Sequence, residues 1–244
     1  MPIIYLSPST QENNYYVNGG TEEEYMNLLA DKMVPYLDAS GIRYVRNTPS
    51  MTAASSIAAS NAGNYDLHLA LHSNAAPIYG SARGSIAFYY PGSAQGKRAA
   101  QIIADGLKAI YPLPDLVRAE ATTAIGEVRR TRAPSVLLEL AFHDNTADAQ
   151  WIKDNLDAVA RNLVLSLTEY FGIPFFEREG SSSGTVDVDW GALNLRARPE
   201  LSAPILAQIP DGTSLPLINR YQDWYLTEYR GTTGYVNARY LSVD

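Results

Sequence analysis

Up to residue 174, hydrophobic positions follow two alternating patterns. Short apolar runs typical of buried strands are separated by longer stretches in which apolar residues recur every three or four positions, as in helices. Strands are predicted at 3–6, 42–45, 66–74, 85–90 and 135–142. Helices are predicted at 21–40, 51–61, 94–110 and 145–171. This order predicts an α/β fold: a mixed or mainly parallel sheet covered by helices on both faces.

The pattern changes after a segment with the composition of a flexible linker, Gly-Ser-Ser-Ser-Gly at 180–184. Beyond it, short strand-like runs are separated by turn sequences such as Pro-Asp-Gly, which is typical of a small all-β barrel. We therefore expect an α/β domain at 1–175, a linker at 176–184 and an all-β domain at 185–244.

Composition narrows the functional classes. The net charge of −7 argues against nucleic acid or an anionic membrane as the main partner. The absence of cysteine excludes disulfides, thiolate metal sites and cysteine nucleophiles. We expect neither a membrane span nor a secretory signal peptide, because the longest apolar runs are short and the first residues carry no basic region. A monomer is expected.

Two of the three histidines lie in one predicted strand, Asp-Leu-His-Leu-Ala-Leu-His-Ser-Asn at 66–74. Alternation places His68 and His72 on the same face, about 13 Å apart at about 3.3 Å per residue, so they cannot hold one metal ion. His72, at the carboxyl end of the strand, is the better site candidate, with Asn74 beside it as a candidate substrate-binding residue. His68 is expected to be a buried, hydrogen-bonded histidine.

Glutamates supply the other candidates. Glu139 interrupts the apolar run 135–142, where burial would raise its pKa toward the range useful for general acid/base catalysis. The alternative is a structural ion pair with a nearby arginine, Arg129, Arg130 or Arg132. Glu22 and Glu23 open the first helix, where carboxylates also simply complement the helix dipole.

These residues, in this order, resemble the zinc-dependent N-acetylmuramoyl-L-alanine amidases of bacterial cell-wall lysis. The resemblance covers roughly residues 2–173. It rests on the closing helix and on five segments: IYLSP, GGTEEEYMNLLAD, YDLHLALHSNAAP, RGSIAFYYP and VRRTRAPSVLLELAFHDN. It implies that a zinc-bound water cleaves the amide between N-acetylmuramic acid and L-alanine. It further implies Glu139 as general acid/base, Arg129 as the arginine before the catalytic strand, and His72 as a zinc ligand.

The resemblance implies two further zinc ligands, and neither of them matches a single residue of this sequence. The ligand glutamate is Glu23 if Asn27 sets the register and Glu22 if the preceding threonine sets it; we favour Glu23. The family's first ligand histidine is missing, because the segment after the first strand reads Ser-Pro-Ser-Thr-Gln-Glu-Asn-Asn at 7–14. Either Glu12 or His143 replaces it, or the metal site is incomplete.

The C-terminal region resembles a bacterial SH3-like domain over about 185–243, through the segments ALNLRARP, DWY and GYV. Such domains often follow cell-wall hydrolases and bind peptidoglycan, which makes Trp224 and Tyr225 candidate substrate-binding residues. The leading hypothesis is therefore a zinc amidase of the autolysin or endolysin kind that acts at the cell wall. The alternatives are a non-catalytic peptidoglycan-binding protein on a degenerate amidase fold and a related zinc peptidase acting on the stem peptide.

Overall fold

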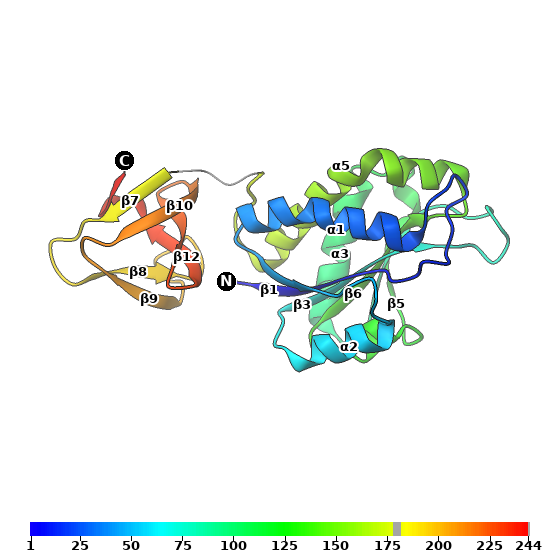
Figure 1. Cartoon of the computed structure of the whole chain (residues 1–244), viewed down its shortest axis with the longest axis horizontal. Helices are drawn as coiled ribbons and strands as arrows, with labels where there is room; N and C mark the ends of the chain where they lie inside the picture. The colour runs from blue at the N-terminus through cyan, green and yellow to red at the C-terminus, as the bar shows by residue number, and fades with distance from the viewer. Residues whose placement is uncertain (178–181, 244) are drawn as a thin grey trace. The chain divides into compact units, whose positions relative to one another are not determined.

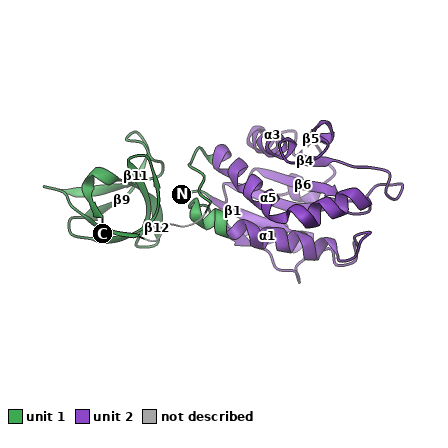
Figure 2. Cartoon of the chain, turned by 90° about the horizontal axis from the view of Figure 1, so that it is seen from above, with its two compact units in different colours: residues 1–2, 35–43, 171–244 green, residues 3–34, 44–170 purple. Residues whose placement is uncertain are grey.

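The structure is a computed structural model that describes residues 1–177 and 182–243. It contains two compact units, one formed by residues 3–34 and 44–170 and the other by residues 1–2, 35–43 and 171–244 (Figure 2). Of the predicted linker 176–184, residues 178–181 lie outside the described residues, and residues 182–184 already belong to a strand. The boundaries proposed from the sequence, at 175 and 185, remain predictions.

A six-stranded sheet forms the centre of the N-terminal region, with the strand order β2-β1-β3-β6-β4-β5. Its strands are β1 (Ile3–Pro8), β2 (Arg43–Arg46), β3 (Leu67–Asn74), β4 (Ser85–Tyr89), β5 (Val117–Ala121) and β6 (Ser135–Phe142). The pairs β1–β3, β3–β6 and β4–β5 are parallel, and the pair β4–β6 is antiparallel. The sheet is therefore mixed and mostly parallel, which confirms the predicted fold class.

Helices cover both faces of this sheet. They are α1 (Glu22–Ala39), α2 (Ala53–Ala62), α3 (Ala94–Lys108), α4 (Gly126–Arg129) and α5 (Thr146–Phe171), with a 3₁₀ turn at Pro114–Leu116. Figure 1 shows α1 and α5 on one face of the sheet and α2 on the other. None of the helices in the described ranges is long and apolar enough to cross a membrane.

Local sequence explains where the long helices begin and which face they bury. Thr21 Oγ1 accepts a hydrogen bond from the Glu24 backbone N–H at 3.2 Å, as expected of an N-cap residue at the start of α1. The predicted inner stripe of α5 is buried, at Ile152, Leu156, Val159, Leu163 and Leu167. Full burial of each such side chain stabilises the fold by about 1.5–3 kcal/mol, so packing on the sheet holds α5 in place.

Sequence reasoning missed one strand and one α-helix of the N-terminal region, namely β5 and α4. The segment of β5, Val-Arg-Ala-Glu-Ala, has few apolar residues because this strand lies at the sheet edge and only Val117 is buried. The helix α4 spans a single turn, which is too short to show a hydrophobic period. It nevertheless contributes a buried carboxylate to the site described below.

The C-terminal region is an antiparallel sheet with the strand order β13-β7-β10-β11-β12-β8-β9. Its strands are β7 (Ser182–Val186), β8 (Ala192–Arg196), β9 (Ile205–Pro210), β10 (Ser214–Tyr221), β11 (Trp224–Tyr229), β12 (Thr232–Asn237) and β13 (Leu241–Val243). A short 3₁₀ helix, Ala238–Tyr240, precedes β13. At the β11–β12 hairpin, Arg230 and Gly231 have φ values of +51° and +74°, which suits the twist of a two-residue turn.

Inward-facing side chains of these strands form the predicted small β core. Its buried members are Val186, Leu193, Leu195, Ile209, Leu215, Leu217 and Val236. A second cluster joins Trp224, Leu226 and Tyr235. The all-β C-terminal architecture predicted from the sequence is therefore confirmed.

Candidate active site

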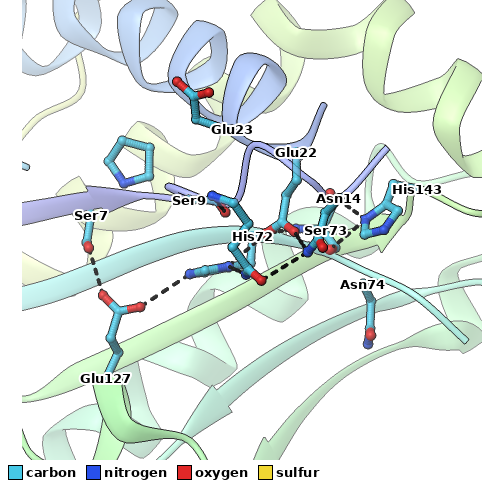
Figure 3. Close-up of polar contacts among 12 residues, drawn as sticks. Ser7, Ser9, Asn14, Glu22, Glu23, His72, Ser73, Asn74, Glu127 and His143 are labelled. Carbon is cyan, nitrogen blue, oxygen red and sulfur yellow. Dashed lines mark hydrogen bonds and ion pairs between the residues drawn. The ribbon is translucent and has the colours of Figure 1, made fainter. Parts of the chain in front are cut away.

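The site is centred on His72, near the carboxyl end of β3. Its Nδ1 lies 2.8 Å from Oε1 of Glu22, in the first turn of α1, and its Nε2 lies 3.3 Å from Oε2 of Glu127, on α4 (Figure 3). Asn14 Nδ2 donates a 2.6 Å hydrogen bond to the other oxygen of Glu22. Because β1, β3 and β6 run parallel, their carboxyl ends meet at one edge, where ligands of such sheets usually bind.

Glu127 connects His72 to the interior of the sheet. Its Oε1 accepts a 2.7 Å hydrogen bond from the Ser7 hydroxyl and lies 3.2 Å from Nε2 of His68. His68 is fully buried, and its Nδ1 lies 3.0 Å from the Ser60 hydroxyl. This agrees with the expectation that His68 is a buried, hydrogen-bonded histidine on the same face as His72.

The opposite charges of His72 and its two glutamate partners shift the pKa values of all three groups. Burial lowers the pKa of His72, but its hydrogen bonds to Glu127 and Glu22, and their negative charges, outweigh burial and raise that pKa. Burial raises the pKa of Glu127, but His68 and His72 more than reverse the effect, so the pKa of this carboxyl lies below its usual range. The pKa of Glu22 is lowered against its burial by His72, with help from Asn14 and Ser9. His72 therefore lies between two carboxylates that favour its protonated form.

Glu139 behaves differently from these two glutamates. It lies on β6 directly opposite His72 on β3 in the parallel register. Its Oε2 is buried and accepts no hydrogen bond from the described residues. Burial raises the pKa of Glu139 to about 7; His72 lowers it somewhat and Glu22 raises it. The structure shows no ion pair between Glu139 and Arg129, Arg130 or Arg132 within the described ranges, so the structural alternative for this carboxylate loses its support.

The structure distinguishes the two candidate ligand glutamates. Glu22 is buried and contacts His72, whereas Glu23 lies one residue further along α1 and is turned away from His72 (Figure 3). The Asn27 amide donates to the Glu23 backbone carbonyl and to that of Ser9, so it ties α1 to the loop after β1. The register based on Asn27, which favoured Glu23, therefore selects a residue that does not reach His72.

Neither candidate for the missing first ligand approaches His72. Glu12 is exposed, and His143 is buried with its Nδ1 within 2.8 Å of the Ser73 carbonyl and 3.0 Å of the Ser73 hydroxyl. Nε2 of Gln11 also lies 3.4 Å from Nδ1 of His72. A neutral amide thus stands beside His72.

The structure places the other predicted site residues outside this cluster. Asn74 Oδ1 accepts a hydrogen bond from the Ala75 backbone N–H at 2.8 Å, and its side chain lies apart from the cluster in Figure 3. Arg129 is exposed, although it shares α4 with Glu127. In the C-terminal region, Trp224 is only 7% exposed, and the ring of Tyr225 lies 5.4 Å from the Arg220 guanidinium.

The described residues do not supply the His/Glu/His zinc set that the resemblance implies. Glu22 and Glu127 flank opposite edges of the His72 ring, so one ion bound to one ring nitrogen cannot be bound by both carboxylates. Within residues 1–177 and 182–243, no three histidine or acidic side chains converge where one metal ion would fit. Of the predicted ligands, the structure brings together only Glu22 and His72.

Sequence reasoning missed Glu127, Gln11 and Asn14. Glu127 lies in a short helix between strands and gives no periodic signal, and only the fold places it against His72. Gln11 and Asn14 lie in the loop after β1, where the sequence search looked for a histidine. A cavity of about 360 Å³ beside His72 and Glu127, lined also by Ser7, Gln11 and Asn47, gives solvent access to the cluster.

A helix-covered mixed sheet with a histidine and three glutamates near the carboxyl ends of its parallel strands defines a hydrolase-like α/β domain. The model of the N-acetylmuramoyl-L-alanine amidase family matches residues 9–169, and the chain belongs to this family. A bacterial SH3 domain model matches residues 191–242, so an SH3 domain follows the amidase domain.

Solved structures share the fold of the amidase domain. The N-acetylmuramoyl-L-alanine amidase AmiC2 of Nostoc punctiforme is 13% identical with a TM-score of 0.62, covering 70% of this chain and 97% of its own. The catalytic domain of the amidase CwlV from Paenibacillus polymyxa is 16% identical with a TM-score of 0.62, covering 71% and 100%. That of the CD27L endolysin targeting Clostridia difficile is 20% identical with a TM-score of 0.58, covering 69% and 98%. A search of curated proteins gave no match.

Proposed function

We propose that this chain hydrolyses the amide between N-acetylmuramic acid and L-alanine in peptidoglycan, with Glu139 as general acid/base. The observation that carries the proposal is the state of Glu139. It is a buried carboxyl opposite His72, with a pKa of about 7 and an oxygen that accepts no hydrogen bond from the described residues. A group with such a pKa accepts and returns a proton near neutral pH, which amide hydrolysis requires.

The proton balance of the reaction suits a single carboxylate. Glu139 takes a proton from the attacking water while the water oxygen bonds to the lactyl carbonyl carbon. The same proton then passes to the alanine nitrogen as the C–N bond breaks. The second water proton, left on the lactyl carboxylic acid, ionises and is taken up by the freed amine, so the products are a lactyl carboxylate and an α-ammonium group. The amidase family is typically zinc-dependent, and zinc would polarise the carbonyl and acidify the water. Since the described residues do not complete a three-ligand site, no step is assigned to zinc.

The C-terminal domain supports the same assignment. An SH3 domain attached to an amidase domain suggests that the chain binds peptidoglycan and acts at the cell wall. With a net charge of −7, this binding would depend on specific contacts and not on a bulk attraction to anionic wall polymers.

The proposal is tested by incubating the full chain with muramyl dipeptide and identifying the products by mass spectrometry. We expect separation of N-acetylmuramic acid from the dipeptide, and loss of at least a hundredfold in rate in Glu139→Gln. Glu169→Gln, which removes an exposed carboxylate of α5, is the matched control and should retain the wild-type rate. Intact substrate after long incubation, with and without added zinc, would overturn the proposal.

The metal requirement has its own measurement. Zinc content is determined for the chelator-washed, zinc-repleted protein and for His72→Ala, Glu22→Ala and Glu23→Ala. Because only Glu22 contacts His72, any zinc that the wild type retains should be lost in His72→Ala and Glu22→Ala and kept in Glu23→Ala. Loss in Glu23→Ala alone would restore the register set by Asn27.

A second candidate function is a non-catalytic peptidoglycan-binding protein. The observation that favours it is the neutral Gln11 amide beside Nδ1 of His72, where a third charged or imidazole ligand would be needed. This function predicts binding of purified sacculi without any cleavage. New α-amino groups without separation of glycan and peptide would instead indicate a peptidase acting on the stem peptide.

A further inference from the structure

A groove on the C-terminal domain is lined by side chains of β8, β9, β11 and β12 and by the loop before β8. Its volume is about 470 Å³. Trp190 and Trp224 both line it, together with three side-chain amides, those of Asn194, Gln208 and Asn237. All of these residues lie within the C-terminal domain, apart from the amidase site.

Trp190 is the feature that packing does not explain. Its side chain is 89% exposed, more than any other large hydrophobic residue in the described ranges. It lies in the loop between β7 and β8, followed by Gly191, whose φ of +82° lets the chain turn sharply there. An exposed indole beside a groove provides a flat apolar surface at low cost in conformational entropy, which favours ligand contact.

The amides of the groove keep unused hydrogen-bonding groups. Gln208 Nε2 donates to Asn194 Oδ1 at 3.3 Å across the β8–β9 pair, which leaves the Asn194 amide nitrogen and the Gln208 carbonyl available. Asn237 Oδ1 accepts the Arg239 backbone N–H at 3.0 Å, which leaves its amide nitrogen available. The groove thus offers both donors and acceptors that carry no charge.

The charge of the lining is balanced. Asp189 and Arg196 are its only charged members, and Arg196 directs Nη1 at the Ala203 carbonyl, 2.9 Å away. A stem peptide carries several free carboxylates and amines, against which this lining offers only one charged side chain of each sign. An N-acetylated sugar carries an acetamido donor and acceptor and an apolar ring face, which match the amides and the indole.

We propose that this groove binds the glycan strand of peptidoglycan, with one N-acetylated sugar stacked on Trp190 and its acetamido group held by the Asn194 and Gln208 amides. The proposal rests on the proposed function, because it assumes peptidoglycan as the target, and it deepens that function by naming the glycan as the part recognised. The C-terminal domain would then hold the chain on the sugar backbone, on which the amide bonds recur.

The test measures binding of the β-1,4-linked tetramer of N-acetylglucosamine to the full chain by isothermal titration calorimetry. We expect saturable binding that weakens at least tenfold in Trp190→Ala and at least threefold in Gln208→Ala. Tyr221→Ala is the matched control, since Tyr221 is an exposed aromatic residue of β10 outside the groove, and it should change the affinity less than twofold.

Three results would overturn the proposal. They are no tetramer binding by the wild type, equal loss of affinity in Trp190→Ala and Tyr221→Ala, or binding of a stem pentapeptide that Trp190→Ala weakens while the tetramer does not bind. The tetramer contains no lactyl amide, so this test is independent of catalysis. Failure of the proposed amidase function would appear separately, as intact muramyl dipeptide.

Discussion

Replacing Glu139 by glutamine should stabilise the protein at alkaline pH while abolishing hydrolysis. The pKa of this buried carboxyl lies at about 7, against 4.5 for a free glutamate. The folded-state pKa is therefore raised, and ionisation favours the unfolded chain. The stability that the protonated carboxyl contributes is fully present below pH 4.5 and is lost as the pH rises through about 7.

The magnitude follows from this difference in proton affinity. Ionisation of Glu139 lowers the free energy of unfolding by about 1 kcal/mol at pH 5 and by about 3 kcal/mol at pH 8.5. Glutamine does not titrate. The stability of Glu139→Gln relative to the wild type should therefore increase by about 2.5 kcal/mol between these two pH values. A constant offset from altered packing leaves this increase unchanged.

Urea denaturation followed by far-ultraviolet circular dichroism measures both free energies, in the presence of a chelator at pH 5 and pH 8.5. Glu169→Gln is the control for loss of one carboxylate from the surface. If the difference between Glu139→Gln and the wild type is the same at both pH values, then burial does not raise the pKa of Glu139. The argument for Glu139 as a general acid/base at neutral pH would then fail.

Two further predictions concern other carboxylates. In Glu127→Gln, His72 loses one of its two carboxylate partners, so the pKa of His72 should fall toward its ordinary value. An NMR titration that gave His72 the same pKa in this variant as in the wild type would contradict the contact between His72 and Glu127. In Asp148→Asn, a fully buried carboxylate that accepts hydrogen bonds from Arg83 Nε at 2.7 Å and Tyr111 Oη at 2.6 Å is lost. We expect the free energy of unfolding in urea to fall by about 3 kcal/mol. The exposed Asp154→Asn on the same helix should change it by less than about 0.5 kcal/mol.

Long periodic segments made most of the fold predictable. The run that became β6 and the stripe that became the buried face of α5 each carry a period that the tertiary structure preserves. The edge strand β5 and the one-turn helix α4 carry no such period. Their conformation is set by neighbours distant in sequence, as when β5 pairs with β4.

The candidate site residues also fall into two groups, those that a local sequence pattern indicates and those that only the fold brings together. Alternation along one strand placed His72 and His68 on a common face, and burial of an isolated carboxylate singled out Glu139. These are local properties, because each depends on the residues immediately before and after.

The sequence by itself thus determined the two-part architecture, the family resemblance and the roles open to His72 and Glu139. Only the tertiary structure decided that Glu22 and not Glu23 faces His72, because adjacent residues of a helix point about 100° apart and the packing of α1 selects one of them. The tertiary structure also placed Glu127 against both histidines. That contact joins residues 55 positions apart in sequence, so no local pattern contains it.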